Sequence, residues 1–147
     1  MAEQFPQSFK APSCALKVLS VERTFWEKAT ILHAEFHRPA DKAMPERFSR
    51  HYCDFHELIR KGVGETATAK PELLARVAEH KTLFFRLSWA RYGEATKGSL
   101  RIAPPEHRLD AVRDDFAKMQ QMFFGAPPEL DAMMGVLEQW ESQFNQK

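Results

Sequence analysis

The amino-acid sequence predicts a mainly α-helical single domain of about five helices, with a minor short strand element and a C-terminal antiparallel αα-hairpin. Apolar residues recur at intervals of three and four along most of the chain, which is the spacing of one helical face. Glycine and proline residues separate the resulting segments. The 147 residues suit one domain, and 44% hydrophobic residues can supply its core.

Composition excludes several classes of protein. The 21 basic and 20 acidic residues nearly balance, so no overall positive field exists to hold nucleic acid non-specifically. The two cysteines, Cys14 and Cys53, are typical of reduced thiols in a cytoplasmic protein. The N-terminal residues lack the apolar segment of a signal peptide, and no apolar run approaches the ~20 residues that cross a bilayer. We therefore expect a cytoplasmic protein without membrane contact.

The first part of the chain predicts an arm, a short strand and a helix. Residues 1–15 are polar and contain two prolines, so we expect a flexible arm before a helical domain of residues 16–147. Residues 15–19 alternate weakly and favour a short strand. Ser20 is a suitable N-cap for a helix over residues 21–36. The apolar face of this helix consists of Phe25, Ala29, Leu32 and Phe36.

Two further helices are predicted in the middle of the chain. One runs from Pro45 to Lys61 and ends at two glycines, after which residues 62–70 are expected to form a loop. Its apolar face consists of Phe48, Tyr52, Phe55 and Ile59. The other helix begins at Pro71, with Leu74, Val77, Lys81 and Phe84 in register. Residues 96–98 favour a turn, and Leu100 and Ile102 a short extended segment.

The last third predicts two helices that pack lengthwise on each other. Apolar residues step by three and four in both, and residues 125–128 separate them with glycine and proline. The first seam consists of Leu109, Val112, Phe116, Met119 and Phe123, and the second of Leu130, Met133, Leu137, Trp140 and Phe144. We expect Trp140 to be deeply buried against the first seam.

Two histidine clusters are candidate metal sites. His33 and His37 lie four residues apart on one helical face, a spacing that can chelate a metal ion. The alternative is a structural role at the edge of the core. His51, Cys53 and His56 point in different directions around a helix, so one ion cannot easily bind all three. Neither cluster completes a tetrahedral set, and we expect no bound zinc; a metal-dependent hydrolase is a distant alternative.

Lysine and aspartate also occur at unusual positions on the first two helices. Lys28 borders an apolar face, where it either extends its ammonium into solvent or meets an anion. Asp54 follows Arg50 and His51 by four and three residues, so it has cationic neighbours on its own helix. The paired acids Asp114-Asp115 favour a solvated face or a capping role.

Two long segments resemble one known protein family. They are residues 16–33, Leu-Lys-Val-Leu-Ser-Val-Glu-Arg-Thr-Phe-Trp-Glu-Lys-Ala-Thr-Ile-Leu-His, and residues 47–55, Arg-Phe-Ser-Arg-His-Tyr-Cys-Asp-Phe. Both are similar to the AbiEii/AbiGii-type nucleotidyltransferase toxins of bacterial abortive-infection and toxin–antitoxin systems of phage defence. A softer resemblance continues through residues 115–125 and 137–145, so it covers the chain from about residue 16 to residue 145.

The resemblance implies a fold similar to the C-terminal part of polymerase β-like nucleotidyltransferases. It implies that Lys28, in the Arg-Thr-Phe-Trp-Glu-Lys motif, contacts nucleotide phosphates. It also implies that Asp54, in a motif that usually reads Arg-His-Tyr-Tyr-Asp, supports the catalytic site. Arg23, Arg50 and His51 belong to the same motifs and are further candidates for nucleotide binding. We expect Lys28 and Asp54 to lie within about 10 Å of each other, near one Debye length at 0.1 M salt.

The sequence departs from the family pattern in two ways. Cys53 stands where a second tyrosine is usual, which changes packing. No Gly-Ser…Asp-x-Asp segment occurs in the 147 residues, although carboxylates of that segment hold the metal ions in such enzymes. We therefore expect a C-terminal portion that is inactive alone and binds no metal, with magnesium and an NTP implied for the complete enzyme.

The sequence leaves two kinds of function open. In the first, the chain is part of an enzyme that transfers a nucleotide from an NTP to an RNA or protein acceptor, with a cognate antitoxin as partner. In the second, it is a non-catalytic helical module that binds an antitoxin, RNA or a second copy of itself.

Overall fold

The computed structural model describes residues 15–123 and 125–146, and it is all-helical over those ranges. Six α-helices and three short 3-10 turns form within them. The α-helices are α1 (Val21–Phe36), α2 (Arg50–Arg60), α3 (Val63–Thr68), α4 (Pro71–Phe84), α5 (Leu109–Lys118) and α6 (Leu130–Asn145). The 3-10 turns are η1 (Tyr92–Glu94), η2 (Glu106–Arg108) and η3 (Gln120–Met122). The mainly α-helical class is confirmed, while the expected flexible arm lies almost wholly outside the described residues.

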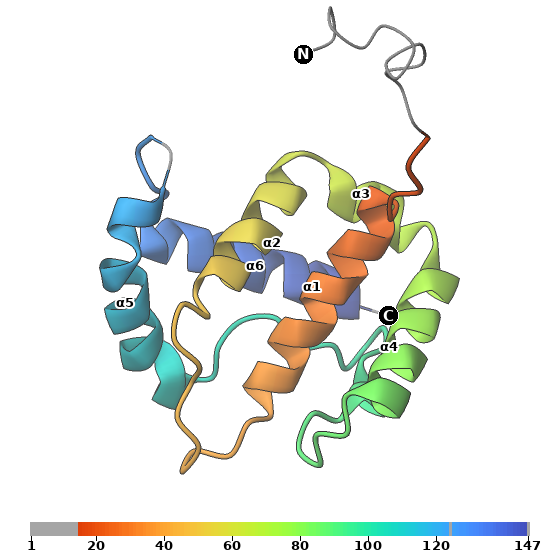
Figure 1. Ribbon diagram of the computed structural model, residues 1–147, viewed down its shortest axis with the longest axis horizontal. Helices are drawn as coiled ribbons and strands as arrows, with labels where there is room; N and C mark the ends of the chain where they lie inside the picture. The colour runs from red at the N-terminus through yellow and green to blue at the C-terminus, as the bar shows by residue number, and fades with distance from the viewer. Residues whose placement is uncertain (1–14, 124, 147) are drawn as a thin grey trace, which may run out of the picture.

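Helix α1 is the centre of the fold, and its bounds agree with those predicted. The Ser20 hydroxyl accepts a hydrogen bond from the Arg23 backbone N–H at 3.3 Å, which caps the first turn. In Figure 1, α1 crosses the middle of the molecule with α2 on one side, α4 on the other and α6 behind. This enclosure buries one face of α1 completely. Its fully buried apolar side chains are Phe25, Trp26, Ala29 and Leu32.

The predicted strand elements do not form in the described part of the chain. Residues 15–20 have no regular structure, and the side chains of Leu16 and Val18 are 79% and 85% exposed. A strand needs a neighbouring strand to pair its backbone groups, and the described residues supply none. Leu100 and Ile102 are fully buried, as an inward-facing segment requires. The backbone groups of residues 100–103 form hydrogen bonds with side chains of α1 and α6 instead of with another strand.

The second helix begins later than predicted, at Arg50 rather than at Pro45. Arg47 adopts a left-handed conformation with φ of 59°, which no helix continues. Asp115 of α5 accepts hydrogen bonds from the backbone N–H groups of this turn. Its carboxylate accepts hydrogen bonds from the Arg47 N–H at 2.6 Å, the Ser49 N–H at 2.8 Å and the Ser49 hydroxyl at 2.5 Å. A buried carboxylate from another helix therefore sets the start of α2, which gives the predicted capping role of Asp115 a defined partner.

The expected loop over residues 62–70 contains a short helix, α3. Gly62 ends α2 with φ of 74°, a conformation that favours glycine. Gly64 then lies so close to Trp140 of α6 that a Cβ there would be 2.8 Å from the indole Nε1. The two glycines thus turn the chain and permit close packing, rather than forming an open loop.

The next helix, α4, begins at Pro71 as predicted, but its register differs at the C-terminal end. Leu74, Val77 and Lys81 are buried, whereas the side chain of Phe84 is 71% exposed. Phe84 therefore belongs to an exposed apolar group at the end of the helix and not to the core. The predicted turn at residues 96–98 is present, with Gly98 at φ of 95°.

The C-terminal hairpin is present only in part. Both helices form, but α5 ends at Lys118 and crosses one end of α6 instead of running along it (Figure 1). Trp140 is half-buried, and it packs on Phe25 of α1 and Phe55 of α2 with ring centroids 5.2 and 5.3 Å apart. The prediction that Trp140 faces the α5 seam was wrong, because α6 shares its apolar face with α1 and α2. No helix in the described ranges has the length and apolar character needed to span a bilayer.

Candidate functional site

Lys28 lies where α1 and α2 pack together, and it joins two of the predicted site residues. Its Nζ donates a hydrogen bond to the Asp54 Oδ2 at 2.6 Å and approaches the His51 Nδ1 at 3.2 Å. His51 and Asp54 are three residues apart on α2, so their side chains share one face of that helix. The predicted proximity of Lys28 and Asp54 is therefore confirmed.

His51 meets Lys28 as a neutral ring. Burial lowers the pKa of His51 to about 4, and the nearby charges of Lys28 and Arg50 lower it as well. An ammonium has hydrogens to donate and no acceptor, so the Nδ1 of His51 must accept and the ring proton lies on Nε2. His51 consequently orients the lysine at neutral pH and is not the cation that we expected beside Asp54.

The two predicted arginines, Arg23 and Arg50, lie on α1 and α2 respectively. Arg23 pairs with Glu27 one turn further along α1, with 3.2 Å between its NH2 and the Glu27 Oε1. Arg50 is exposed at the first residue of α2, one turn before Asp54. After burial and the charge of Lys28, the charge of Arg50 also lowers the pKa of His51. The structure thus pairs Arg23 with Glu27 rather than with Asp54, and it places Arg50 one turn before Asp54 on α2.

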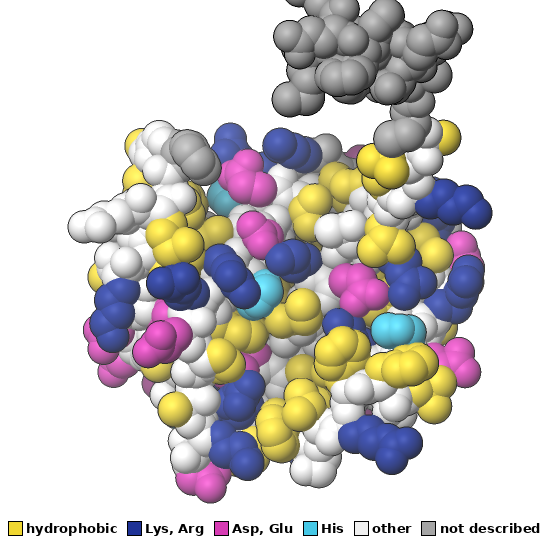
Figure 2. Space-filling model, viewed as in Figure 1, with side chains coloured by type: hydrophobic (Ala, Val, Ile, Leu, Met, Phe, Trp, Pro, Cys, Tyr) yellow, Lys and Arg dark blue, Asp and Glu magenta, His cyan; other side chains and the backbone are white. Residues whose placement is uncertain are grey.

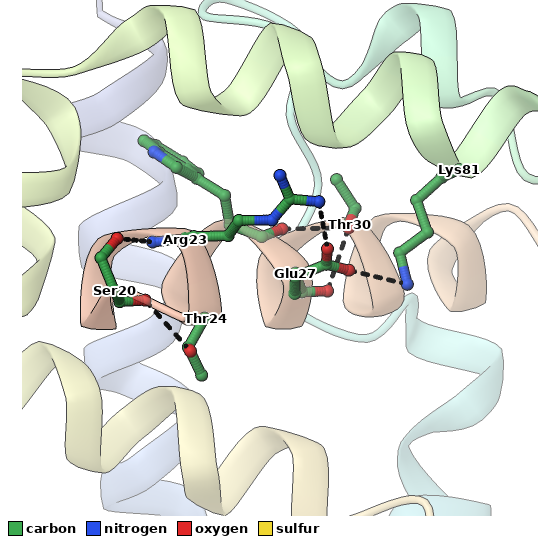
Figure 3. Close-up of polar contacts among 7 residues, drawn as sticks. Ser20, Arg23, Thr24, Glu27, Thr30 and Lys81 are labelled. Atoms are coloured by element: carbon green, nitrogen blue, oxygen red, sulfur yellow. Dashed lines mark hydrogen bonds and ion pairs between the residues drawn. The ribbon is translucent and has the colours of Figure 1, made fainter. Parts of the chain in front are cut away.

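Glu27 and Lys81 were not among the predicted site residues. The Lys81 Nζ lies 3.0 Å from the Glu27 Oε2 and 4.4 Å from the centre of the Phe85 ring. Figure 3 shows Arg23 and Lys81 converging on the Glu27 carboxylate, Lys81 from α4 and Arg23 from α1 itself. One sign of this site was present in the sequence, a lysine in register with the apolar residues of α4. Val77 and Ala78, about one helical turn before Lys81, are both buried.

His33 is a structural histidine in the core. Its Nε2 lies 3.1 Å from the Arg91 carbonyl oxygen, and its Nδ1 accepts a hydrogen bond from the Arg101 N–H at 3.0 Å. Burial lowers the pKa of His33 to about 4. Both ring nitrogens are therefore occupied, and neither offers a lone pair to a metal ion. His37 packs edge-on against the His33 ring at 4.7 Å, so the pair is not arranged as two ligands.

The second histidine cluster is divided by the helix, as its spacing predicted. His51 faces Lys28, whereas Cys53 and His56 are buried on other sides of α2. Burial raises the pKa of the Cys53 thiol to about 12, so the thiolate needed for metal binding or nucleophilic attack does not form at neutral pH. Across the described ranges, no three histidine, cysteine, aspartate or glutamate side chains gather as a metal site.

Comparison with known proteins identifies the family. A family model for the nucleotidyl transferase AbiEii toxin of type IV toxin–antitoxin systems matches residues 2–145. No curated protein and no solved structure matches the chain. The family match spans nearly all of the 147 residues and includes both segments that carry Lys28 and Asp54. The chain therefore belongs to the AbiEii family of nucleotidyltransferase toxins of type IV toxin–antitoxin systems.

Proposed function

We propose that this chain supplies the nucleotide-binding part of a nucleotidyltransferase toxin, corresponding to its C-terminal portion. The complete enzyme would transfer a nucleotide from an NTP to an RNA or protein acceptor. Lys28 contacts the phosphates, while Asp54 and His51 hold its ammonium in place. The observation that carries this proposal is the position of the Lys28 Nζ, 2.6 Å from the Asp54 carboxylate at the solvent-facing junction of two helices.

The hydrogen-bonding capacity of Lys28 supports phosphate binding. An ammonium has three hydrogens, and Asp54 and His51 account for two of them. The third remains for an anion, since the Lys28 and Asp54 side chains are 24% and 50% exposed. An ion pair this open to solvent contributes only about 0–1 kcal/mol to stability. Fold stability alone therefore gives little reason for this geometry.

Magnesium, which the family implies, does not fit the donor set of this site. Asp54 is the carboxylate that Lys28 contacts, and its Oδ2 already accepts a hydrogen bond from the ammonium. Mg²⁺ prefers near-octahedral coordination by oxygen ligands, usually including one or two carboxylates. Two-metal sites need more such ligands than Asp54 offers. The role proposed for Lys28, His51 and Asp54 is therefore binding and orientation of the nucleotide.

Equilibrium dialysis with the four labelled ribonucleoside triphosphates tests the proposal. We expect the wild-type protein to retain at least one of them and Lys28→Met to bind it at least tenfold more weakly. Asp54→Asn should weaken binding less, because the lysine remains but is held less firmly. Lys118→Met is the matched control, since Lys118 is an exposed lysine on α5. Equal binding by Lys28→Met and the wild type would contradict the proposal.

A non-catalytic binding module is the second candidate, and exposed apolar side chains favour it. They occur in two groups: Leu16, Val18, Leu19 and Val21 before and at the start of α1, and Leu83, Phe84, Phe85 and Leu87 at the end of α4. Membership of a toxin–antitoxin family implies a cognate antitoxin, which such surfaces could bind. Antitoxin binding that survives Lys28→Met, together with no NTP retention by the wild type, would favour this candidate.

A further inference from the structure

We propose that Lys81 and Arg23, both held by Glu27, form a second phosphate-binding position beside Lys28, so that a triphosphate lies across α1 from α2 to α4. We call the side chains of Asp54, Lys28, Glu27, Lys81 and Arg23 the charged row. This inference rests on the proposed function and extends it, because it names Lys81 as a ligand-contacting residue outside the two motifs that first indicated the site.

The charged row is continuous because α1 carries its central members at consecutive positions. Glu27 reaches Lys81 on α4, and Lys28 reaches Asp54 on α2. Adjacent residues of a helix point about 100° apart, which directs these two side chains to the helices on either side. Figure 1 shows α2 and α4 flanking α1, and Figure 2 shows basic, acidic and histidine side chains gathered across the middle of the same face.

The two ends of the row also lie within electrostatic range of each other. The charge of Lys81 on α4 is among the causes that lower the pKa of His51 on α2. His51 is itself 3.2 Å from the Lys28 Nζ. Lys81 on α4 and Lys28 on α1 therefore both act on the same side chain of α2.

The burial of Lys81 calls for a reason beyond stability. Its side chain is 9% exposed, so its ammonium has lost most of its hydration. Replacing a buried ion pair by well-packed apolar residues is often neutral or stabilising, because removing two charges from water is costly. The aromatic face of Phe85, 4.4 Å away, fixes the ammonium further. Stability alone therefore does not explain the buried charge of Lys81.

The balance of charge in the row favours a polyanion. Glu27 lies between two cations, so the Arg23, Glu27 and Lys81 group keeps one net positive charge. Asp54 offsets Lys28, and the exposed Arg50 adds another cation at the start of α2. Arginine has five N–H donors and lysine three, of which Glu27 engages a minority. A triphosphate, with several charges spread over its length, matches two separated cationic positions better than one orthophosphate does.

Phosphorus-31 NMR titration with inorganic tripolyphosphate and with orthophosphate tests the proposal without requiring knowledge of the base. We expect Lys28→Met to weaken the binding of both anions. Lys81→Met should weaken tripolyphosphate at least tenfold while changing orthophosphate less than twofold, because Lys28 still holds a single phosphate. The matched control is Lys70→Met, since Lys70 also pairs with a glutamate of α1, Glu22, but outside the row.

A second variant keeps the test decisive if Lys81→Met does not fold. Glu27→Gln retains the shape of the side chain and removes one negative charge from the row. We expect it to bind tripolyphosphate about threefold or more tightly than the wild type at low salt, whereas Glu22→Gln should leave the affinity unchanged. A purely structural Glu27 would give no increase.

The outcomes separate this inference from the proposed function. Wild-type tripolyphosphate affinity in Lys81→Met, or an equal loss of both anions, overturns the role of Lys81. Weaker or unchanged binding by Glu27→Gln overturns it independently. If Lys28→Met still reduces binding in those cases, the proposed function stands. If Lys28→Met also binds both anions like the wild type, the proposed function fails and this inference fails with it.

Discussion

Single polar side chains hold the irregular parts of this molecule by bonding to the main chain. The Glu141 carboxylate of α6 accepts hydrogen bonds from the backbone N–H groups of Ile102 and Ala103. His33 of α1 accepts another from the Arg101 N–H. Arg108, a buried guanidinium, donates to the Pro39 and Lys42 carbonyl oxygens at 2.6 Å each. Residues far apart in sequence thus satisfy backbone groups that a β-ladder would otherwise pair.

The buried His33 predicts a loss of stability in mild acid. Burial lowers its pKa from 6.5 to about 4 in the folded protein, so the unfolded chain binds the proton more readily. The contribution of His33 is complete above pH 6.5 and is lost progressively as the pH falls towards 4. The full shift corresponds to roughly 3 kcal/mol in the free energy of unfolding. Urea denaturation at a series of pH values measures it.

His33→Gln should remove the part of this pH dependence that belongs to His33, because glutamine does not titrate, while His51, whose pKa burial also lowers to about 4, keeps its own part. His107→Gln is the control, since His107 is exposed on η2. His33→Gln will also lower stability at pH 7, because one amide cannot make both hydrogen bonds of the ring. A slope between pH 6.5 and 4 that is the same in His33→Gln and in the wild type would show that another group is responsible.

At the scale of elements, the start of α2 depends on a carboxylate that belongs to α5. Asp115→Asn should destabilise the protein by about 2 kcal/mol, because it removes a buried charge that accepts three hydrogen bonds. The neighbouring Asp114 is exposed, so Asp114→Asn should change the free energy of unfolding by less than about 0.5 kcal/mol. Chemical denaturation compares the two. Equal effects would mean that the turn before α2 is stable without Asp115.

The contact between α3 and α6 predicts opposite effects for two glycine substitutions. Gly64→Ala should destabilise by about 1 kcal/mol or more, because the added Cβ would lie 2.8 Å from the Trp140 Nε1 and displace the indole. Gly135→Ala, in the interior of α6 with open space around the added Cβ, should stabilise by about 0.5–1 kcal/mol. Thermal or urea unfolding measures both. A neutral Gly64→Ala would show that Trp140 moves aside freely.

At the scale of the whole molecule, the chain is expected to bind a nucleotide without transferring it. The 147 residues contain no Gly-Ser…Asp-x-Asp segment, and Asp54 is committed to Lys28. Incubation with labelled NTPs, magnesium and total RNA should therefore transfer nothing above background, because metal-aligned transfer needs further carboxylates. Labelled NTP retained on the same sample is the positive control. Transfer by the wild type that disappears in Lys28→Met would refute this expectation.

Much of the site could be predicted, but its charge relations could not. Lys28 and Asp54 were identified from two sequence motifs, and they were expected to lie within about 10 Å of each other. The neutral state of His51 depends on burial by residues that are remote in sequence. The position of Lys81 depends on its ion pair with Glu27, which lies 54 positions earlier. The packing of the helices determines which charged side chains form ion pairs, and sequence motifs do not specify that packing.

Local patterns in the sequence determined which segments become helical and which faces are apolar. The bounds of α1 followed from a capping serine, the period of its apolar residues and the breaking residues after it, all of which act within a few residues. The start of α2, the presence of α3 and the partner of α6 were decided only in the tertiary structure. Asp115 of α5 determines where α2 begins, and α3 packs closely against Trp140 of α6.

The apolar stripe of α6 shows the physical reason for this division. Its period specified that one face must be buried, but hydrophobic attraction has no direction and does not name the partner. Residues 109–123 offered a matching stripe next in sequence, yet Phe25 and Phe55 form the surface on which Trp140 packs. The period of the apolar residues therefore determined which face of each helix is buried. Competition among all apolar faces of the chain determined which neighbouring helix that face packs against.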